Sequence, residues 1–312
     1  MAEFFRNSDA FVWSIEGDPR LRSTIVTLVL LDRNPNWEQV VDRFELLSRT
    51  MPMFRQRVML SPPPAPPRWE VDPDFDLAFH LRRVTAPEPG TVDTLLEMAR
   101  LAAMADFDRA RPLWEATVID GLADGGAALL CKLNHALTDG IGAVQMAMTL
   151  YDRTERHEDR GAMPMEPPLA AAGPFAGIRD VISYDAGLAA TVLTGSLKAA
   201  PALIVNGVRR PLETLSSVRS TLASIYRTVR PISKPGSPIM RDRGKIRRLA
   251  VHQVSKKSLR EAGRVAGGSL NDAFIAAVAG GLRRYHEKHG VSVGDLVVTM
   301  PISIRTPADP VG

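Results

Sequence analysis

A histidine followed closely by a Thr-Asp-Gly turn is the feature of this sequence best suited to chemistry. His135 ends the apolar run 127–134, and Thr138, Asp139 and Gly140 come shortly after it. Imidazole is the side chain that most readily transfers protons near neutral pH, and here backbone and carboxylate can hold it in place. The pattern predicts a proton-transferring histidine where a strand gives way to a helix.

Two other chemistries are open to the same residues. If the run before the histidine is a strand, Cys131 and His135 lie roughly 13 Å apart, at about 3.3 Å per residue, which is too far for a thiolate–imidazole pair. If it is a helix, Cys131, His135 and Asp139 share one face and resemble metal ligands. The strand-like run and the turn oppose the helix, so we expect neither a cysteine nucleophile nor a metal site.

The role of Asp139 stays open among three interpretations. Its carboxylate would pair with a cation that braces the loop, which is the role we favour, or it would fold back to a ring nitrogen of His135, or it would cap the helix that begins near Gly140. Under the last interpretation His135 is an ordinary hydrogen-bonded histidine without a chemical role.

Strands and helices alternate around this motif. The sequence predicts strands at 23–31, 69–71, 77–84, 114–119 and 127–134, and helices at 36–48, 91–105 and 140–151. These predictions follow from β-branched apolar runs and from helical spacing of apolar residues, with Thr91 as the expected N-cap of the second helix. Neighbouring strand pairs mix with strand–helix units, so we expect an α/β domain with a mixed sheet over residues 1–153.

The rest of the chain predicts a linker and the start of a second α/β pattern. The Pro/Ala/Gly-rich segment 154–174 is the expected linker, with helices at 178–200 and 212–229, so residues 154–244 are assigned to linker and connecting helices. A strand at 246–254, helices at 256–265 and 269–288, and a strand at 296–304 follow. Two strands cannot bury both faces of a sheet, so residues 245–312 either augment the first domain or begin a second, truncated one.

The composition describes a globular protein with a slight excess of positive charge. Its 312 residues include 39 basic and 35 acidic side chains, and only 6% are aromatic, which disfavours nucleic-acid binding. The single cysteine and the absence of an apolar leader at the start predict a cytoplasmic protein. The most apolar window, 187–197, is shorter than a membrane span requires.

Four separate segments accompany the histidine motif. They are 9–13 (DAFVW), 111–115 (RPLWE), 269–272 (SLND) and 301–305 (PISIR). Together with 135–140 (HALTDG), they resemble the motifs of the bacterial wax ester synthase/diacylglycerol acyltransferase family, within the chloramphenicol acetyltransferase-like superfamily. The resemblance implies an α/β fold of that type, a two-layer mixed sheet with helices, with a second similar domain that is incomplete.

The chain departs from the family pattern in two ways. Asn134 stands where the family usually has the first of two tandem histidines. In the family pattern the second histidine is the catalytic one, so the resemblance implies that His135 keeps this role. Strand alternation points the Asn134 side chain to the opposite face of the sheet. Family members also continue well beyond residue 312. The resemblance therefore implies a fragment, an inactive relic, or one half of a split protein with a complementary C-terminal polypeptide.

The resemblance implies transfer of a long-chain fatty acyl group from acyl-CoA to a diacylglycerol or a long-chain alcohol. His135 would be the general base, with acyl-CoA as co-substrate and no cofactor. Asn271 would donate to the oxyanion or belong to a helix cap, and Asp272 would be structural. Arg305 would pair with Asp139 or lie solvated at a strand end.

Two alternatives remain beside this function. One is another reaction of the superfamily, such as acetyl transfer or condensation. The other is a non-catalytic protein that binds a lipid surface or a partner. A basic cluster would meet coenzyme A phosphates or an anionic lipid surface, or would simply be a hydrated loop, and it consists of Arg241, Arg243, Lys245, Arg247 and Arg248. We expect any association with membranes or lipid droplets to be peripheral.

Overall fold

The structure is a computed structural model whose described residues fall into two compact units. It describes residues 3–5, 10, 13–14, 16–61, 66–137, 140–152, 154, 159–166, 168, 236–240 and 244–296. The first unit contains the described residues up to 168 together with Lys245–Leu249. The second contains residues 236–240, Gly244 and 250–296.

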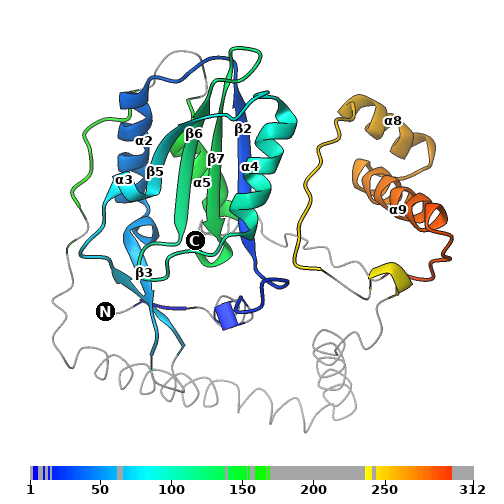
Figure 1. The fold of residues 1–312 in the computed structure, drawn as a ribbon, viewed down its shortest axis with the longest axis horizontal. Helices are drawn as coiled ribbons and strands as arrows, with labels where there is room; N and C mark the ends of the chain where they lie inside the picture. Colours follow the sequence, from blue (N-terminus) through cyan, green and yellow to red (C-terminus); the bar gives the residue numbers. More distant parts are fainter. Residues whose placement is uncertain are drawn as a thin grey trace, which may run out of the picture. The chain divides into compact units, whose positions relative to one another are not determined.

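A four-stranded mixed sheet forms the centre of the first unit (Figure 1). Its strand order is β2, β7, β6, β5, and the strands are β2 (Thr24–Leu31), β7 (Ala127–Asn134), β6 (Trp114–Asp120) and β5 (Leu81–Thr85). Strand β7 runs antiparallel to β2 and β6, whereas β5 runs parallel to β6. The predicted α/β domain with a mixed sheet is confirmed.

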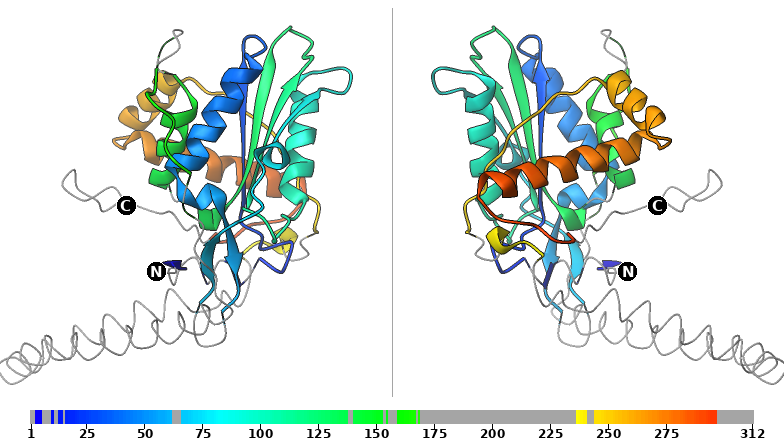
Figure 2. Two further views of the ribbon diagram at one scale, coloured as in Figure 1. Left: turned by 90° about the vertical axis from the view of Figure 1, so that its left-hand side faces the viewer. Right: turned by 90° about the vertical axis from the view of Figure 1, so that its right-hand side faces the viewer.

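Helices cover both faces of this sheet (Figure 2). Helices α2 (Trp37–Thr50) and α5 (Gly140–Leu150) share one core with Leu129, Cys131 and Leu133 of β7. Helix α4 (Val92–Met104) lies on the other face, in a second core with Ala128 and Leu130. Both faces of β7 are therefore covered by helices. Because successive side chains of a strand point to opposite faces, burial of both faces accounts for the apolar side chains at consecutive positions of β7.

Polar side chains fix where the main helices begin. The Asn36 side chain accepts a hydrogen bond from the Gln39 amide at 3.1 Å and so caps α2. The prediction that Thr91 caps α4 is confirmed, and the Thr94 hydroxyl accepts a hydrogen bond from the Thr91 amide at 3.2 Å. Both contacts satisfy amide groups that have no partner inside the helix.

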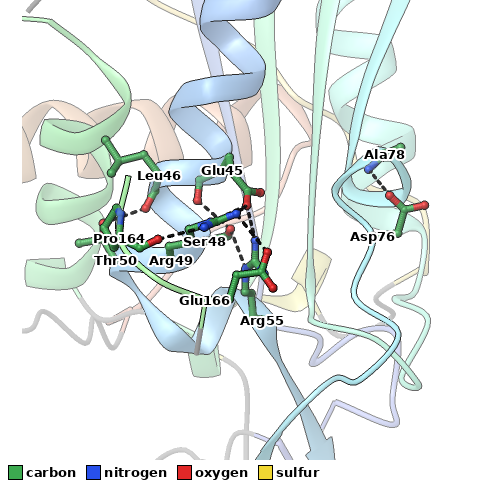
Figure 3. A network of polar contacts seen from close by, with 10 residues as sticks. All are labelled: Glu45, Leu46, Ser48, Arg49, Thr50, Arg55, Asp76, Ala78, Pro164 and Glu166. Carbon is green, nitrogen blue, oxygen red and sulfur yellow. Dashed lines mark hydrogen bonds and ion pairs between the residues drawn. The ribbon is translucent and has the colours of Figure 1, made fainter. Parts of the chain in front are cut away.

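A smaller antiparallel sheet joins β1 (Glu3–Phe4), β4 (Arg68–Val71) and β3 (Gln56–Met59), the last of which follows a 3-10 helix at Pro52–Arg55. The strand predicted at 69–71 is confirmed as β4. The strand predicted at 77–84 is wrong in its first half, which forms the short helix α3 (Leu77–His80). Asp76 causes this difference, because its carboxylate accepts a hydrogen bond from the Ala78 amide at 2.9 Å (Figure 3).

The second unit consists mainly of a helix pair. Helices α8 (Lys256–Val265) and α9 (Leu270–Lys288) confirm the predictions for 256–265 and 269–288. They approach closely at Gly263, where a Cβ atom would lie 2.4 Å from the Ser269 carbonyl oxygen. Beside α9, the Ser237 hydroxyl lies 2.7 Å from His286 Nε2, next to the 3-10 helix Pro238–Met240.

The strand predicted at 246–254 is wrong. These residues form no strand, and Ile246, Val251 and Val254 are largely exposed. A strand needs a neighbour to take up its backbone hydrogen bonds, and the described residues provide none. The helices predicted at 178–200 and 212–229, the strand at 296–304 apart from Leu296, and most of the linker at 154–174 lie outside the described residues.

In the described part of the chain, no single helix is long and apolar enough to cross a membrane. Only α8 and α9 taken together, with a 95° bend between them, reach the required length and hydropathy.

An ionic network anchors the segment after α5 to helix α2 (Figure 3). Glu45 accepts hydrogen bonds from both Arg49 and Arg55 at 2.6 Å, and the Arg55 guanidinium also donates to the Ser48 hydroxyl. Arg49 donates to the Pro164 carbonyl and to Glu166, each at 3.0 Å. Arg55 is only 7% exposed, so its charge depends on its two carboxylate partners, Glu45 at 2.6 Å and Glu166 at 3.5 Å.

We therefore expect Glu45→Gln to lower the free energy of unfolding of the first unit by about 1–3 kcal/mol, because it removes the closer of the two carboxylates that pair with the buried Arg55 guanidinium. Urea unfolding followed by tryptophan fluorescence measures this, since all four tryptophans belong to the first unit. Glu166→Gln is the matched comparison within the same network: Glu166 also pairs with Arg49 and Arg55, but its side chain is 62% exposed, so we expect a change within about 0.5 kcal/mol. Equal effects of the two substitutions would contradict this account.

Candidate active site

His135 emerges from the end of the central strand. Strand β7 ends at Asn134, His135–Leu137 form a single 3-10 turn, and α5 begins at Gly140. The His135 side chain is exposed, whereas Ala136 and Leu137 after it are buried. The imidazole is thus accessible to a molecule in solution while the backbone that carries it is fixed in the core.

Asn134 turns inward where His135 turns outward. It is 1% exposed, and its Nδ2 donates to Glu16 Oε2 at 2.6 Å. Its Oδ1 accepts a hydrogen bond from the Ala136 amide at 2.9 Å, and its own amide donates to the Leu113 carbonyl at 3.0 Å. Asn134, which stands where the family motif has a histidine, is therefore buried with hydrogen bonds from its side chain and from its backbone amide.

Cys131 is unsuited to act as a nucleophile. It is 3% exposed, and burial raises the pKa of its thiol to about 12. The thiolate, which is the reactive form, is therefore nearly absent at neutral pH. Of the two residues on β7 and its end that could do chemistry, only His135 meets solvent.

Two residues of the expected loop brace cannot be placed. Asp139 and Arg305 lie outside the described residues, as does Thr138. Gly140 is the first residue of α5. The ion pair between Asp139 and Arg305 stays a prediction.

Asn271 and Asp272 lie in the first turn of α9, in the second unit. The cap of this helix is formed by Ser269 and Asp272, because the Ser269 hydroxyl accepts a hydrogen bond from the Asp272 amide and Asp272 Oδ2 accepts one from the Ser269 amide at 2.7 Å. The Ser269 amide and hydroxyl hold the pKa of the Asp272 carboxyl below its usual value. The helix cap is thus provided by Asp272 together with Ser269, as expected of a structural residue. Asn271, next to Asp272 in the sequence, is exposed.

Trp114, in the Pro-Leu-Trp segment, packs in the core. It is 1% exposed, its indole nitrogen donates to the Phe54 carbonyl at 2.8 Å, and its ring stacks on Phe44 and His80. His80 is fully buried, and its Nδ1 donates to the Trp114 carbonyl at 2.7 Å. Burial lowers the pKa of His80, so this second histidine is held neutral.

A cavity of about 490 Å³ lies at the far end of the sheet from His135, between α2 and α5. Its lining includes the apolar side chains of Val40, Phe44 and Leu129, and the buried ion pair of Arg43 with Asp152. Leu129 is roughly 20 Å from His135 along β7, at about 3.3 Å per residue. This cavity is therefore separate from the candidate site.

The described residues contain no group of three or more His, Cys, Asp or Glu side chains that could hold a metal ion.

Glu16 is the residue of this site that sequence analysis missed. It is 3% exposed and lies 118 positions from its partner Asn134 in the chain. Neither residue stands in a local pattern that would link one to the other. Only the pairing of strand β2 with β7, which places Thr24 opposite Asn134, brings the segment of Glu16 to the end of β7.

The sequence profile of the wax ester synthase/diacylglycerol acyltransferase catalytic domain matches residues 5–274. A Mycobacterium tuberculosis protein that carries the name of a diacylglycerol O-acyltransferase is 37% identical over 300 residues, which are 95% of this chain and 60% of that protein. A second such protein of the same organism is 32% identical over 311 residues, 96% of this chain and 62% of its own.

A solved structure, the wax ester synthase/diacylglycerol acyltransferase from Marinobacter aquaeolei VT8, matches 92% of this chain and 61% of its own at a TM-score of 0.58 and 22% identity. This likeness confirms the α/β fold. The chain spans about three fifths of the length of these relatives.

The environment of His80 makes stability depend on pH. Its pKa is lower in the folded state than in the unfolded state, so below about pH 6.5 the unfolded chain binds a proton that the folded chain resists. We expect the free energy of unfolding to fall as the pH drops from about 7 to 5, by at most about 1.4 kcal/mol per pH unit from this residue.

The test compares urea unfolding of the wild type with that of His80→Asn over this pH range. The asparagine amide can still donate to the Trp114 carbonyl but does not titrate, so the variant should show a shallower pH dependence. His252→Asn, at an exposed histidine, should leave the slope unchanged. Parallel curves for wild type and His80→Asn would contradict the assignment.

Proposed function

Because this chain belongs to the wax ester synthase/diacylglycerol acyltransferase family, we propose that the protein transfers a long-chain fatty acyl group from acyl-CoA to a hydroxyl group. The acceptor would be a diacylglycerol or a long-chain alcohol, and the product a triacylglycerol or a wax ester. The names of the relatives support this reaction class. The observation that carries the proposal is the exposed imidazole of His135 at the fixed end of β7.

In this mechanism His135 is the general base. The neutral imidazole takes the proton of the acceptor hydroxyl as its oxygen attacks the thioester carbonyl carbon. The tetrahedral intermediate then collapses, the carbon–sulfur bond breaks, and the imidazolium returns the proton to the leaving thiolate of coenzyme A. The acyl group passes directly to the acceptor, and the rate depends on holding both substrates together beside the base.

The buried thiol supports direct transfer rather than an acyl-enzyme. With its pKa raised to about 12 and its side chain in the core, Cys131 is not available to attack the thioester. The attacking group is then the acceptor hydroxyl, which His135 deprotonates as the new bond forms.

Two further roles are carried over from the family motifs as proposals. The Asn271 amide would donate to the developing oxyanion, since capping of α9 is already provided by Ser269 and Asp272. Asp139 and Arg305 would form an ion pair that braces the loop after His135. A complementary polypeptide that corresponds to the rest of the longer relatives would complete the substrate site.

We expect His135→Gln to lower acyl-CoA turnover by about 10²–10⁴-fold, because a positioned base contributes about that much. The assay follows coenzyme A release with diacylglycerol or hexadecanol as acceptor, for the chain alone and mixed with the complementary polypeptide. His252→Gln, at an exposed histidine of the second unit, is the matched control and should keep its activity.

Full turnover by a folded His135→Gln protein would overturn the assignment of the base. A series of acyl-CoA donors tests the reaction class separately. Preference for acetyl-CoA over long-chain donors would contradict the lipid substrates and favour another reaction of the superfamily.

The basic segment Lys245–Leu249 suggests that the protein binds anionic lipid surfaces peripherally. Lys245 and Arg248 are exposed, and Ile246 between them is 74% exposed. The segment is held in the first unit by Arg247, which donates to the Arg22 carbonyl at 2.8 Å. Cations flanking an exposed apolar side chain suit an anionic membrane surface.

We expect Lys245→Ala and Arg248→Ala each to weaken binding to vesicles that contain phosphatidylglycerol by about fivefold, since each cation near the surface contributes about 1 kcal/mol. Sedimentation with phosphatidylcholine/phosphatidylglycerol vesicles measures this. Arg33→Ala removes a cation that is 76% exposed elsewhere and should have little effect. Equal loss for all three variants, or equal binding to pure phosphatidylcholine, would contradict a specific surface.

A further inference from the structure

A buried amide–carboxylate pair lies directly behind the candidate base. Asn134 and Glu16 are 1% and 3% exposed, and their side chains share a hydrogen bond of 2.6 Å. We propose that Asn134 and Glu16 are positioning residues that fix the direction in which His135 leaves the sheet. The proposal rests on the role of His135 as the base in the proposed function.

The hydrogen bonds of this pair hold the backbone on both sides of His135. Before it, the Asn134 amide donates to the Leu113 carbonyl at 3.0 Å. After it, the Ala136 amide donates to Asn134 Oδ1 at 2.9 Å. The side chain of Asn134 thus ties the 3-10 turn back to the strand, and His135 is the single residue between the two fixed points.

Glu16 in turn fixes the side chain of Asn134. Its Oε2 accepts a hydrogen bond from the side-chain Nδ2 of Asn134, and its Oε1 accepts one from the backbone amide of Ser23 at 3.3 Å, just before β2 begins. Since Thr24 is paired with Asn134 across β2 and β7, the carboxylate bridges the ends of two adjacent strands. Groups from three parts of the chain therefore determine the geometry of the turn: Glu16 and Ser23, Leu113, and Asn134 with Ala136.

The described hydrogen-bond partners of this pair carry no charge other than that of Glu16 itself. The described contacts of the Glu16 carboxylate come from neutral donors, the Asn134 side chain and the Ser23 amide. The cationic residues that lie close in sequence to Glu16 or Asn134 form ion pairs with other carboxylates. Arg20 pairs with Asp18, Arg22 with Asp106, and Lys132 with Glu115.

Asp139, which also belongs to this loop, lies outside the described residues. A histidine at position 134, as the family motif has it, would bring a second imidazole into the support of the base. Asparagine provides the hydrogen bonds of this support without a titratable side chain at position 134.

The decisive test first replaces the donor of the hydrogen bond between Asn134 and Glu16 by a second carboxylate, and then exchanges donor and acceptor between the two positions. Asn134→Asp places two carboxylates within hydrogen-bond distance, where both cannot be ionised together. We expect its kcat at pH 7.5 to fall at least tenfold with KM nearly unchanged, and its kcat relative to the wild type at the same pH to recover as the pH is lowered and the two carboxylates share a proton.

The double variant Asn134→Asp/Glu16→Gln should recover most of the lost kcat. The new amide at position 16 donates to the new carboxylate at position 134, which still accepts from the Ala136 amide. The amide oxygen at position 16 still accepts from Ser23. Every hydrogen bond is retained with the charge moved to the other partner. The single variant Glu16→Gln, which lacks this match, should lose kcat about fivefold at every pH.

Asn36→Asp makes the same chemical change at the exposed cap of α2, away from His135, and should leave kcat unchanged. Near-ultraviolet circular dichroism at each pH shows whether the variants are folded. A wild-type kcat and pH profile in Asn134→Asp, or a double variant that is no better than this single one, would overturn the proposal.

A readout without turnover separates this proposal from the proposed function. The imidazole resonances of His135 in NMR spectra should shift in Asn134→Asp and return in the double variant. If His135→Gln keeps full activity while these resonances respond, the base assignment fails and the positioning role stands. If the resonances do not respond, the positioning role fails whatever the activity.

Discussion

The structure depends on one strand being covered on both of its faces. All eight residues of β7 are buried, and successive side chains alternate between the core under α2 and α5 and the core under α4. A shift of register by one residue would send every side chain to the opposite face, so the pairing of β7 with its neighbours is strongly specified. The point at which His135 leaves the sheet is therefore set by the core, and the loop only has to direct the ring.

The boundary between core and solvent falls between two consecutive residues. Burying the Asn134 amide would be costly if its polar atoms lacked partners, and the structure supplies Glu16 and the Ala136 amide for them. These hydrogen bonds remove the side chain's freedom to rotate and limit that of the following turn. The proposed base, His135, gains a defined position in this way without being buried itself.

The sequence was sufficient for elements whose apolar pattern is strong and for caps that act locally. It identified β7, α5 and the Thr91 cap, because each depends on residues within a few positions of one another. It failed at 77–84, where the Asp76 cap outweighed strand propensity, and at 246–254, where an alternating pattern found no partner strand. Glu16 was missed for the same reason that residues 246–254 were wrongly predicted as a strand. Contacts between segments that are distant in the sequence cannot be predicted from the spacing of neighbouring residues.

The environment decides which of two reactive groups on this strand and its end can act. Cys131 and His135 are separated by four positions, and neither is distinguished by residue type alone, since thiols and imidazoles both serve in acyl transfer. Burial raises the thiol pKa to about 12, so the reactive thiolate is scarce at neutral pH, and the core also keeps substrates away from it. The imidazole lies past the end of the strand and is exposed to water. This difference in solvation supports the proposed direct transfer with His135 as the base.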